Sequence, residues 1–130
     1  MVPNPVKTFT RWAQAQPSVT ALCSNRVSYR LEGTYPAIRV TDVGPVERAP
    51  GERFNRVQVE CWAADYDSAF SLASAVDQAI QDGTLRGVWG GQPCAGGAVV
   101  SGPFANPDET TQKFCHTFDV DMWLYATPPN

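Results

Sequence analysis

The chain has 130 residues, 10 of them basic and 13 acidic, with a formal net charge of -3 at pH 7. This length is typical of one domain and allows about two thirds of the unfolded surface to be buried. A slightly acidic chain without a run of Lys and Arg argues against nucleic-acid binding through a basic face. The chain does not begin like a signal peptide and has no apolar run long enough for a membrane span, so we expect a soluble protein made in the cytoplasm.

The amino-terminal segment predicts a short amphipathic helix. Asn4 can cap this helix, and Pro5 suits its first turn because the N–H that proline lacks would have no partner there. Apolar residues follow at helical spacing until Pro17 ends the run. We expect one further helical turn around residues 19–22.

A two-stranded hairpin and a long loop are expected next. Apolar and polar residues alternate over 27–31 and again over 38–41, on either side of a turn at Gly33–Pro36. The segment Gly44–Arg53 is polar, contains two prolines and is about as long as a loop becomes without a role of its own. We interpret it as a projecting loop and favour a contact arm for a neighbouring subunit, the alternative being an idle exposed loop.

The middle third predicts a strand, a tight corner and a helix that packs on the strand. Residues 57–63 alternate apolar and polar, and the helix after them carries an apolar stripe on one side. Asp65 or Asp67 can cap the start of this helix, and Gly83 can adopt the left-handed conformation that closes its end. The stripe consists of Ala69, Leu72, Ala73, Val76, Ala79 and Ile80.

The segment Gly83–Gly97 is rich in glycine, but it lacks the motifs and the downstream helix start of phosphate-binding loops. We interpret it as a connection whose Trp89 packs on the core. A short strand at 98–100 and a turn within 103–108 precede the last strand, 114–125. The length and apolar face of that strand suit a central position in an antiparallel sheet.

The last strand also carries the candidate chemical groups. His116 lies on its apolar face, where a lone histidine is more often a hydrogen-bonded core residue than a catalyst, and Cys115 points to the opposite face. Asp119 and Asp121 share one face about 7 Å apart, within range of a carboxylate pair for hydrolysis or a metal, although a solvated strand face explains them better. We therefore predict no catalytic, cofactor or metal site.

The four cysteines have no metal-ligand or redox spacing, and we expect reduced, mostly buried thiols, with a disulfide as the alternative. They are Cys23, Cys61, Cys94 and Cys115. Together the elements predict an α+β fold with a single domain over 1–130. We expect a mainly antiparallel sheet of about four to five strands, an N-terminal helix and one central helix packed on the sheet, and a long projecting loop.

Candidate interface residues come from the loop and from aromatic side chains. The periodicity leaves four aromatic residues partly outside the core, either at an interface between subunits or under a second helical layer of the monomer. These four are Trp12, Trp62, Trp123 and Tyr125. The interface residues that we predict are Val46, Glu47, Arg48, Glu52, Arg53, Trp62, Trp123 and Tyr125.

The order of elements, together with the run from Arg56 to Ala69, resembles the tail-terminator or tail-completion family of long-tailed bacteriophages. Members of that family show a strand ending in an aromatic and a small residue, then an acidic, Tyr-like corner and an Ala-rich helix. The topology match covers about residues 6–125, whereas the residue match is confined to the middle and the segment Gly83–Gly97 matches no family pattern. The matching positions are Val59, Trp62, Ala63, Asp65, Tyr66, Ala69, Leu72 and Ala73.

The resemblance implies a structural role without a reaction or cofactor. Family members form a ring, usually of six subunits, that caps the tail tube, stops its polymerisation and joins the tail to the head connector. Expected partners are therefore further copies of the chain, the tail tube protein and the head-tail connector, with no membrane and no specific nucleic acid, although DNA can pass through the ring. The expected location is the head-proximal end of the virion tail, after assembly in the host cytoplasm.

Two other interpretations stay open. One is a head-closure or connector protein of the head-tail joint, which would associate with portal-side components instead of capping tubes. The other is a small enzyme or ligand-binding domain that uses Asp119, Asp121 or His116, which would need a concave polar pocket around those residues.

Overall fold

The computed structural model describes residues 4–49, 52–108 and 113–125. Helices and strands together account for most of these residues. In chain order the elements are α1 (Pro5–Gln14), α2 (Pro17–Cys23), β1 (Val27–Ser28), β2 (Ala37–Ala49), β3 (Glu52–Ala63), α3 (Tyr66–Gln81), β4 (Gly87–Trp89), β5 (Gln92–Asp108) and β6 (Lys113–Leu124).

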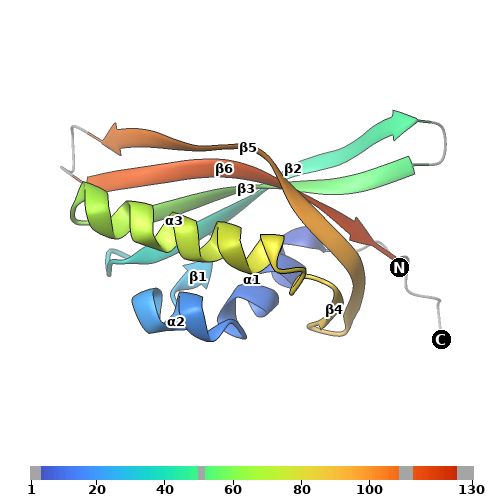
Figure 1. Cartoon of the computed structure of the whole chain (residues 1–130), viewed down its shortest axis with the longest axis horizontal. Helices are drawn as coiled ribbons and strands as arrows, with labels where there is room; N and C mark the ends of the chain where they lie inside the picture. The colour runs from blue at the N-terminus through green and yellow to red at the C-terminus, as the bar shows by residue number, and fades with distance from the viewer. Residues whose placement is uncertain (1–3, 50–51, 109–112, 126–130) are drawn as a thin grey trace.

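The strands of the described residues form one six-stranded sheet in the order β1-β2-β3-β6-β5-β4. β1 runs parallel to β2, and every other neighbouring pair is antiparallel. Figure 1 shows α1, α2 and α3 together on one side of this curved sheet. The architecture is therefore two layers, with helices on one face of the sheet only.

The core lies between α3 and the central strands β3 and β6. The six residues of the predicted α3 stripe are all buried, which confirms that prediction. All of them except Ala69 belong to the same buried cluster as Val57 and Val59 of β3 and Phe118 and Val120 of β6, which face each other across the strand pair. This strand pair is the centre of the sheet, as the long apolar face of β6 predicted.

The helix ends are formed by the residues that the sequence indicated. Asn4 Oδ1 accepts a hydrogen bond from the Lys7 backbone N–H at 3.1 Å, and Asp65 Oδ1 accepts one from the Ser68 N–H at 2.7 Å. At the end of α3, Gly83 has φ +81° and donates its N–H to the Ile80 carbonyl. Each contact satisfies a backbone group that a helix end leaves unpaired.

The sheet differs from the prediction in strand number and direction. It is mixed and six-stranded, and the expected hairpin over 27–41 is wrong, because β1 is only two residues long and runs parallel to β2. The physical reason is the connection Tyr29–Pro36, which carries the chain back so that β2 runs in the same direction as β1, with Ile38 opposite Val27. Arg26 holds this connection, since its Nε donates to the Pro36 carbonyl at 2.8 Å.

Within the segment Gly44–Arg53, residues 50 and 51 lie outside the described residues, and the others are not a loop but the paired outer halves of β2 and β3. The two strands pair from Gly44 opposite Arg56 to Ala49 opposite Glu52, with register shifts near Asp42 and Glu47. Proline is tolerated because, among the described residues, β1 pairs only with the start of β2, and the remainder of β2 is a sheet edge. The segment does project, since Figure 1 shows this hairpin extending past the helices at the right.

The same correction applies to β5. Residues 103–108, expected to turn, belong to this 17-residue strand, which pairs with β6 through several register shifts and with β4 only at residues 92–94. After Cys94, β5 has no neighbour on its outer side among the described strands. Pro103 and Pro107 therefore remove no hydrogen bond from a second strand pair. Trp89 packs against the core and donates its Nε1 hydrogen to the Leu85 carbonyl at 2.8 Å, as expected.

Gly97 lies at a close approach of β5 to the backbone of β6. A Cβ atom at this position would lie 2.7 Å from both the Asp121 carbonyl oxygen and Leu85 Cδ1. We expect Gly97→Ala to lower the free energy of unfolding by about 2 to 3 kcal/mol, measured by urea denaturation, because the backbone of β6 cannot yield easily.

Gly83→Ala is the matched control. Gly83 has a positive φ but no atom within 4 Å of the added Cβ, so the variant should lose only the backbone preference, about 1 kcal/mol. Equal stability of the two variants would contradict the close approach at Gly97.

Candidate functional site

The face of the sheet opposite the helices is charged, and we call it the polar face. Two ion pairs connect its neighbouring strands: Arg39 of β2 with Glu60 of β3, and Arg56 of β3 with Asp121 of β6. The second pair is bidentate, with Arg56 Nε 2.7 Å from Asp121 Oδ1 and Nη2 3.1 Å from Oδ2. Side chains alternate between the two faces of the sheet along each strand. The charged and polar residues on the polar face are Arg39 of β2, Arg56, Gln58 and Glu60 of β3, and Thr117, Asp119 and Asp121 of β6.

The environment of Asp121 differs from the one that the sequence predicted. We expected Asp119 and Asp121 to form a solvated strand face, but the Asp121 side chain is 0% exposed. The carboxylate can be buried because the guanidinium of Arg56 meets both of its oxygens, and this hydrogen bond in turn raises the pKa of Arg56. Asp121 is thus engaged with Arg56 and is not displayed beside Asp119 as a free carboxylate pair.

The predicted aromatic residues divide between the core and the surface. Trp12 is fully buried, because α1 packs it inside the helical layer where its Nε1 donates to Thr84 Oγ1 at 3.1 Å, so placing it outside the core was wrong. Trp62 is 9% exposed on the polar face, and its Nε1 has no hydrogen-bond partner among the described residues. Trp123 and Tyr125, at the end of β6, are 37% and 59% exposed. Trp123 packs edge-on against Phe54, with ring centroids 4.7 Å apart.

The structure describes only the backbone of the five candidate interface residues in the β2-β3 hairpin. Their backbones belong to the paired strands β2 and β3. Their side chains lie outside the described part of the structure, and the interface role stays a prediction. These residues are Val46, Glu47, Arg48, Glu52 and Arg53.

The cysteines are buried, as predicted, and are free thiols. Burial raises the pKa of the Cys115 thiol to about 11 and that of the Cys61 thiol well above its usual value. A thiol that remains protonated is a poor nucleophile. His116 does not change this, because it lies on the opposite face of β6 from Cys115, among the core residues.

Sequence reasoning missed an aromatic cluster at the start of α3. Tyr66 and Phe70 stack with a centroid distance of 6.3 Å and an interplanar angle of 7°, although they are 49% and 50% exposed. Both rings contact the His116 ring in T-shaped arrangements, with centroid distances of 5.0 Å for Tyr66 and 5.7 Å for Phe70. His116 is 3% exposed and its Nε2 has no hydrogen-bond partner among the described residues, so the expected hydrogen bond is not seen there. The signal was present in the sequence as two aromatic residues four positions apart, on the same side of the helix and at the border of the apolar stripe.

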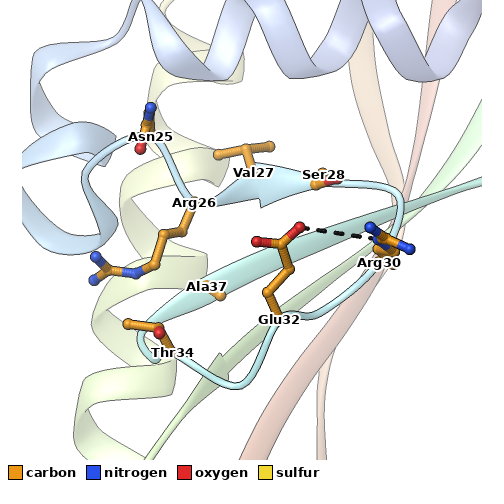
Figure 2. Close-up of a pocket in the computed structure, with 8 residues that line it drawn as sticks. All are labelled: Asn25, Arg26, Val27, Ser28, Arg30, Glu32, Thr34 and Ala37. Atoms are coloured by element: carbon orange, nitrogen blue, oxygen red, sulfur yellow. Dashed lines mark ion pairs between the residues drawn. The ribbon is translucent and has the colours of Figure 1, made fainter.

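Two concave surfaces lie near β1. One, of about 320 Å³, is lined by β1 and the connection after it. Figure 2 shows its Arg30 and Glu32 side chains pointing toward each other, 3.9 Å apart, while Arg26 extends away. The charged groups are therefore paired with each other or turned away, and do not converge on a space where a substrate could react.

The second concave surface is an open groove of about 590 Å³ between α1 and the residues that follow β1. We call it the α1 groove. Its polar lining comes mainly from α1, and Tyr29 closes one side with 67% of its surface exposed. The lining residues used below are Lys7, Arg11, Gln14, Ser28 and Tyr29.

Among the described residues, no group of three or more His, Cys, Asp or Glu side chains could hold a metal ion. No helix in that part of the chain is long and apolar enough to cross a membrane.

Comparison with known proteins gives a likeness of fold. No protein-family model matches the sequence, and no curated protein matches it either. Among solved structures, the chain is similar to one from the virion of a native gene transfer agent particle. The two share 12% sequence identity with a TM-score of 0.64, over 92% of this chain and 92% of the other. At this identity the likeness shows a shared fold across almost the whole length of both chains.

The Arg56–Asp121 pair supports a stability prediction. Arg56→Leu leaves a buried carboxylate without its cation, and we expect the free energy of unfolding to fall by roughly 3 kcal/mol in urea denaturation. Arg30→Leu is the control, because the Arg30–Glu32 pair is 68% and 75% exposed and should contribute less than about 1 kcal/mol. Similar losses in both variants would show that burial of Asp121 does not matter.

His116 supports a prediction on pH. Burial lowers the pKa of His116 below its unfolded value of about 6.5, so below that pH the unfolded chain binds more protons than the folded one. Stability should therefore fall as the pH drops from 7 through 6.5 until the folded pKa is reached. His116 is the single histidine of the chain, and His116→Gln should flatten this part of the profile of unfolding free energy against pH. An unchanged slope would mean that another group titrates there.

Proposed function

We propose that this protein is a structural component of a virion, and more specifically a tail terminator. In this role it forms a ring, of six copies by analogy with the family, that caps the tail tube, stops its polymerisation and joins the tail to the head connector. The observation that carries the proposal is the likeness of fold, over nearly the full chain, to a chain from a gene transfer agent virion. The role involves no reaction and no cofactor.

The local geometry of the middle segment supports the same proposal. The family resemblance rests on a strand, an acidic and aromatic corner, and an Ala-rich helix. In the structure β3 ends at Ala63, Asp65 caps α3, and Tyr66 begins the helix. The residues that carry the resemblance therefore form one continuous unit at the centre of the fold.

The edges of the sheet are suited to assembly. Among the described residues, β1 covers only Ile38 and Arg39 of β2, and β4 covers only residues 92–94 of β5. Both long strands therefore present backbone N–H and C=O groups along their outer edges, and these two edges lie at opposite ends of the strand order. A ring needs two different surfaces on each subunit, and this sheet offers two different edges.

A head-closure or connector protein is the second candidate. It would use the same fold and be part of the same joint, but it would bind portal-side components and leave tube length unaffected. A ligand-binding domain is disfavoured by the site geometry, because Asp121 is occupied by Arg56 and His116 is covered by Tyr66 and Phe70.

The proposal is tested with the cognate tail tube protein. We expect tubes polymerised in the presence of this protein to be shorter and to carry a ring at one end in negative-stain images, because a bound cap removes the growing end. Tube protein alone, and tube protein with a heat-denatured sample of this chain, are the controls. Unchanged tube length with no ring at either end would overturn the terminator role and favour the connector.

A further inference from the structure

The start of α3 presents a surface that we call the α3 tip, made of Asp65, Tyr66, Asp67 and Phe70. The two rings stack on each other, rest on the edge of His116 and keep about half of their surface exposed. Rigid aromatic side chains of this kind lose little conformational entropy on binding and often anchor interfaces. The two exposed carboxylates beside them give the tip a negative charge.

The α1 groove has the opposite charge. Lys7 and Arg11 lie one helical turn apart on its α1 side, and Tyr29 exposes two thirds of its surface on the other. The first 31 residues contain Lys7, Arg11, Arg26 and Arg30 but no Asp or Glu. Glu32, the first acidic residue of the chain, pairs with Arg30, whereas no acidic residue is among the described residues that line the groove beside Lys7 and Arg11.

The α3 region shows the converse distribution. Residues 57–85 contain five acidic residues and no Lys or Arg. Four of the five, Asp65, Asp67, Asp77 and Asp82, lie in α3 or cap its ends. The helical layer of one subunit thus has a basic amino-terminal part and an acidic third helix. Opposite charges on separate surfaces favour contact between copies and accelerate it.

We propose that the α1 groove of one copy receives the α3 tip of the next copy. This inference rests on the proposed ring and names its contact. Figure 1 shows the start of α3 at the left end of the view and α1 well to its right, so the two surfaces lie at different places on the molecule. Such a contact is heterologous and repeats around a ring or along a filament. Tyr66 and Phe70 supply the apolar anchor, and Asp67 meets the positive charge of Lys7 and Arg11.

Charge reversal tests this contact. The wild type should self-associate in sedimentation-equilibrium measurements at low salt, and more weakly at 0.5 M salt, since exposed charges are then screened within about 4 Å. We expect Asp67→Lys to weaken association at least about tenfold, because it places like charges together. The groove variant Lys7→Glu/Arg11→Glu should do the same, and its Glu at position 7 is the third helical residue after Asn4, where a carboxylate suits the helix start.

A combined variant that carries all three substitutions should regain association within about threefold of the wild type, because the charges are exchanged and complementary again. Asp82→Lys is the matched control, since it makes the same charge change at the other end of α3 and should leave association unchanged. Circular dichroism of each variant monitors the fold. Phe70→Ser, which removes an exposed ring without a charge change, should also weaken association.

The outcomes separate this inference from the proposed function. A wild type that stays monomeric at low salt, equal effects of Asp67→Lys and Asp82→Lys, or no recovery in the combined variant would each overturn the groove contact. None of these results would alter the tube-capping test, because that test measures tube length and the presence of a ring at the tube end, and not self-association in solution. Capping that survives Asp67→Lys would show that the ring uses another surface.

Discussion

The burial of one side of α3 against the β3-β6 strand pair is the contact on which the rest of the molecule depends. Small residues such as Ala69, Ala73 and Ala79 let the helix approach the sheet closely, while Leu72 and Val76 fill the space over the strands. This packing covers one face of the sheet. Side chains alternate along β3 and β6, so every other residue points to the opposite face. It also holds the start of α3 at one end of the molecule, where Tyr66 and Phe70 remain partly exposed above His116.

The uncovered side of the sheet is stabilised in a different way. Four of its charged residues form cross-strand pairs, because the register of β3 against β2 and β6 places Arg39 beside Glu60 and Arg56 beside Asp121. A buried carboxylate is tolerated there only because a guanidinium meets it. These pairs explain why acidic residues on a central strand need not indicate catalysis. The long outer edges of β2 and β5, beyond the short strands β1 and β4, also keep backbone groups that no other described strand pairs.

These features are the ones on which the proposed assembly with other copies rests. Buried thiols, a covered histidine and paired carboxylates leave no reactive group displayed in the cavities described above. The surfaces that remain available are extended edges, exposed aromatic rings and regions of opposite charge. Such surfaces are typical of proteins that build larger structures, which is the role that we propose for this chain.

Local patterns in the sequence determined the elements whose cause is local. The caps Asn4 and Asp65, the stripe of α3 and the inward face of β6 follow from hydrogen-bonding groups and periodicity within a few residues, and all were predicted correctly. Only the tertiary structure decided the direction of β1, the extension of β2 and β5 through their prolines, and the burial of Trp12 and Asp121. Each of these depends on a partner distant in sequence: whether a strand is an edge, which strand neighbours it, and whether a cation such as Arg56 lies opposite a carboxylate. The aromatic pair of the α3 tip was visible as a spacing, but its place above His116 required the fold.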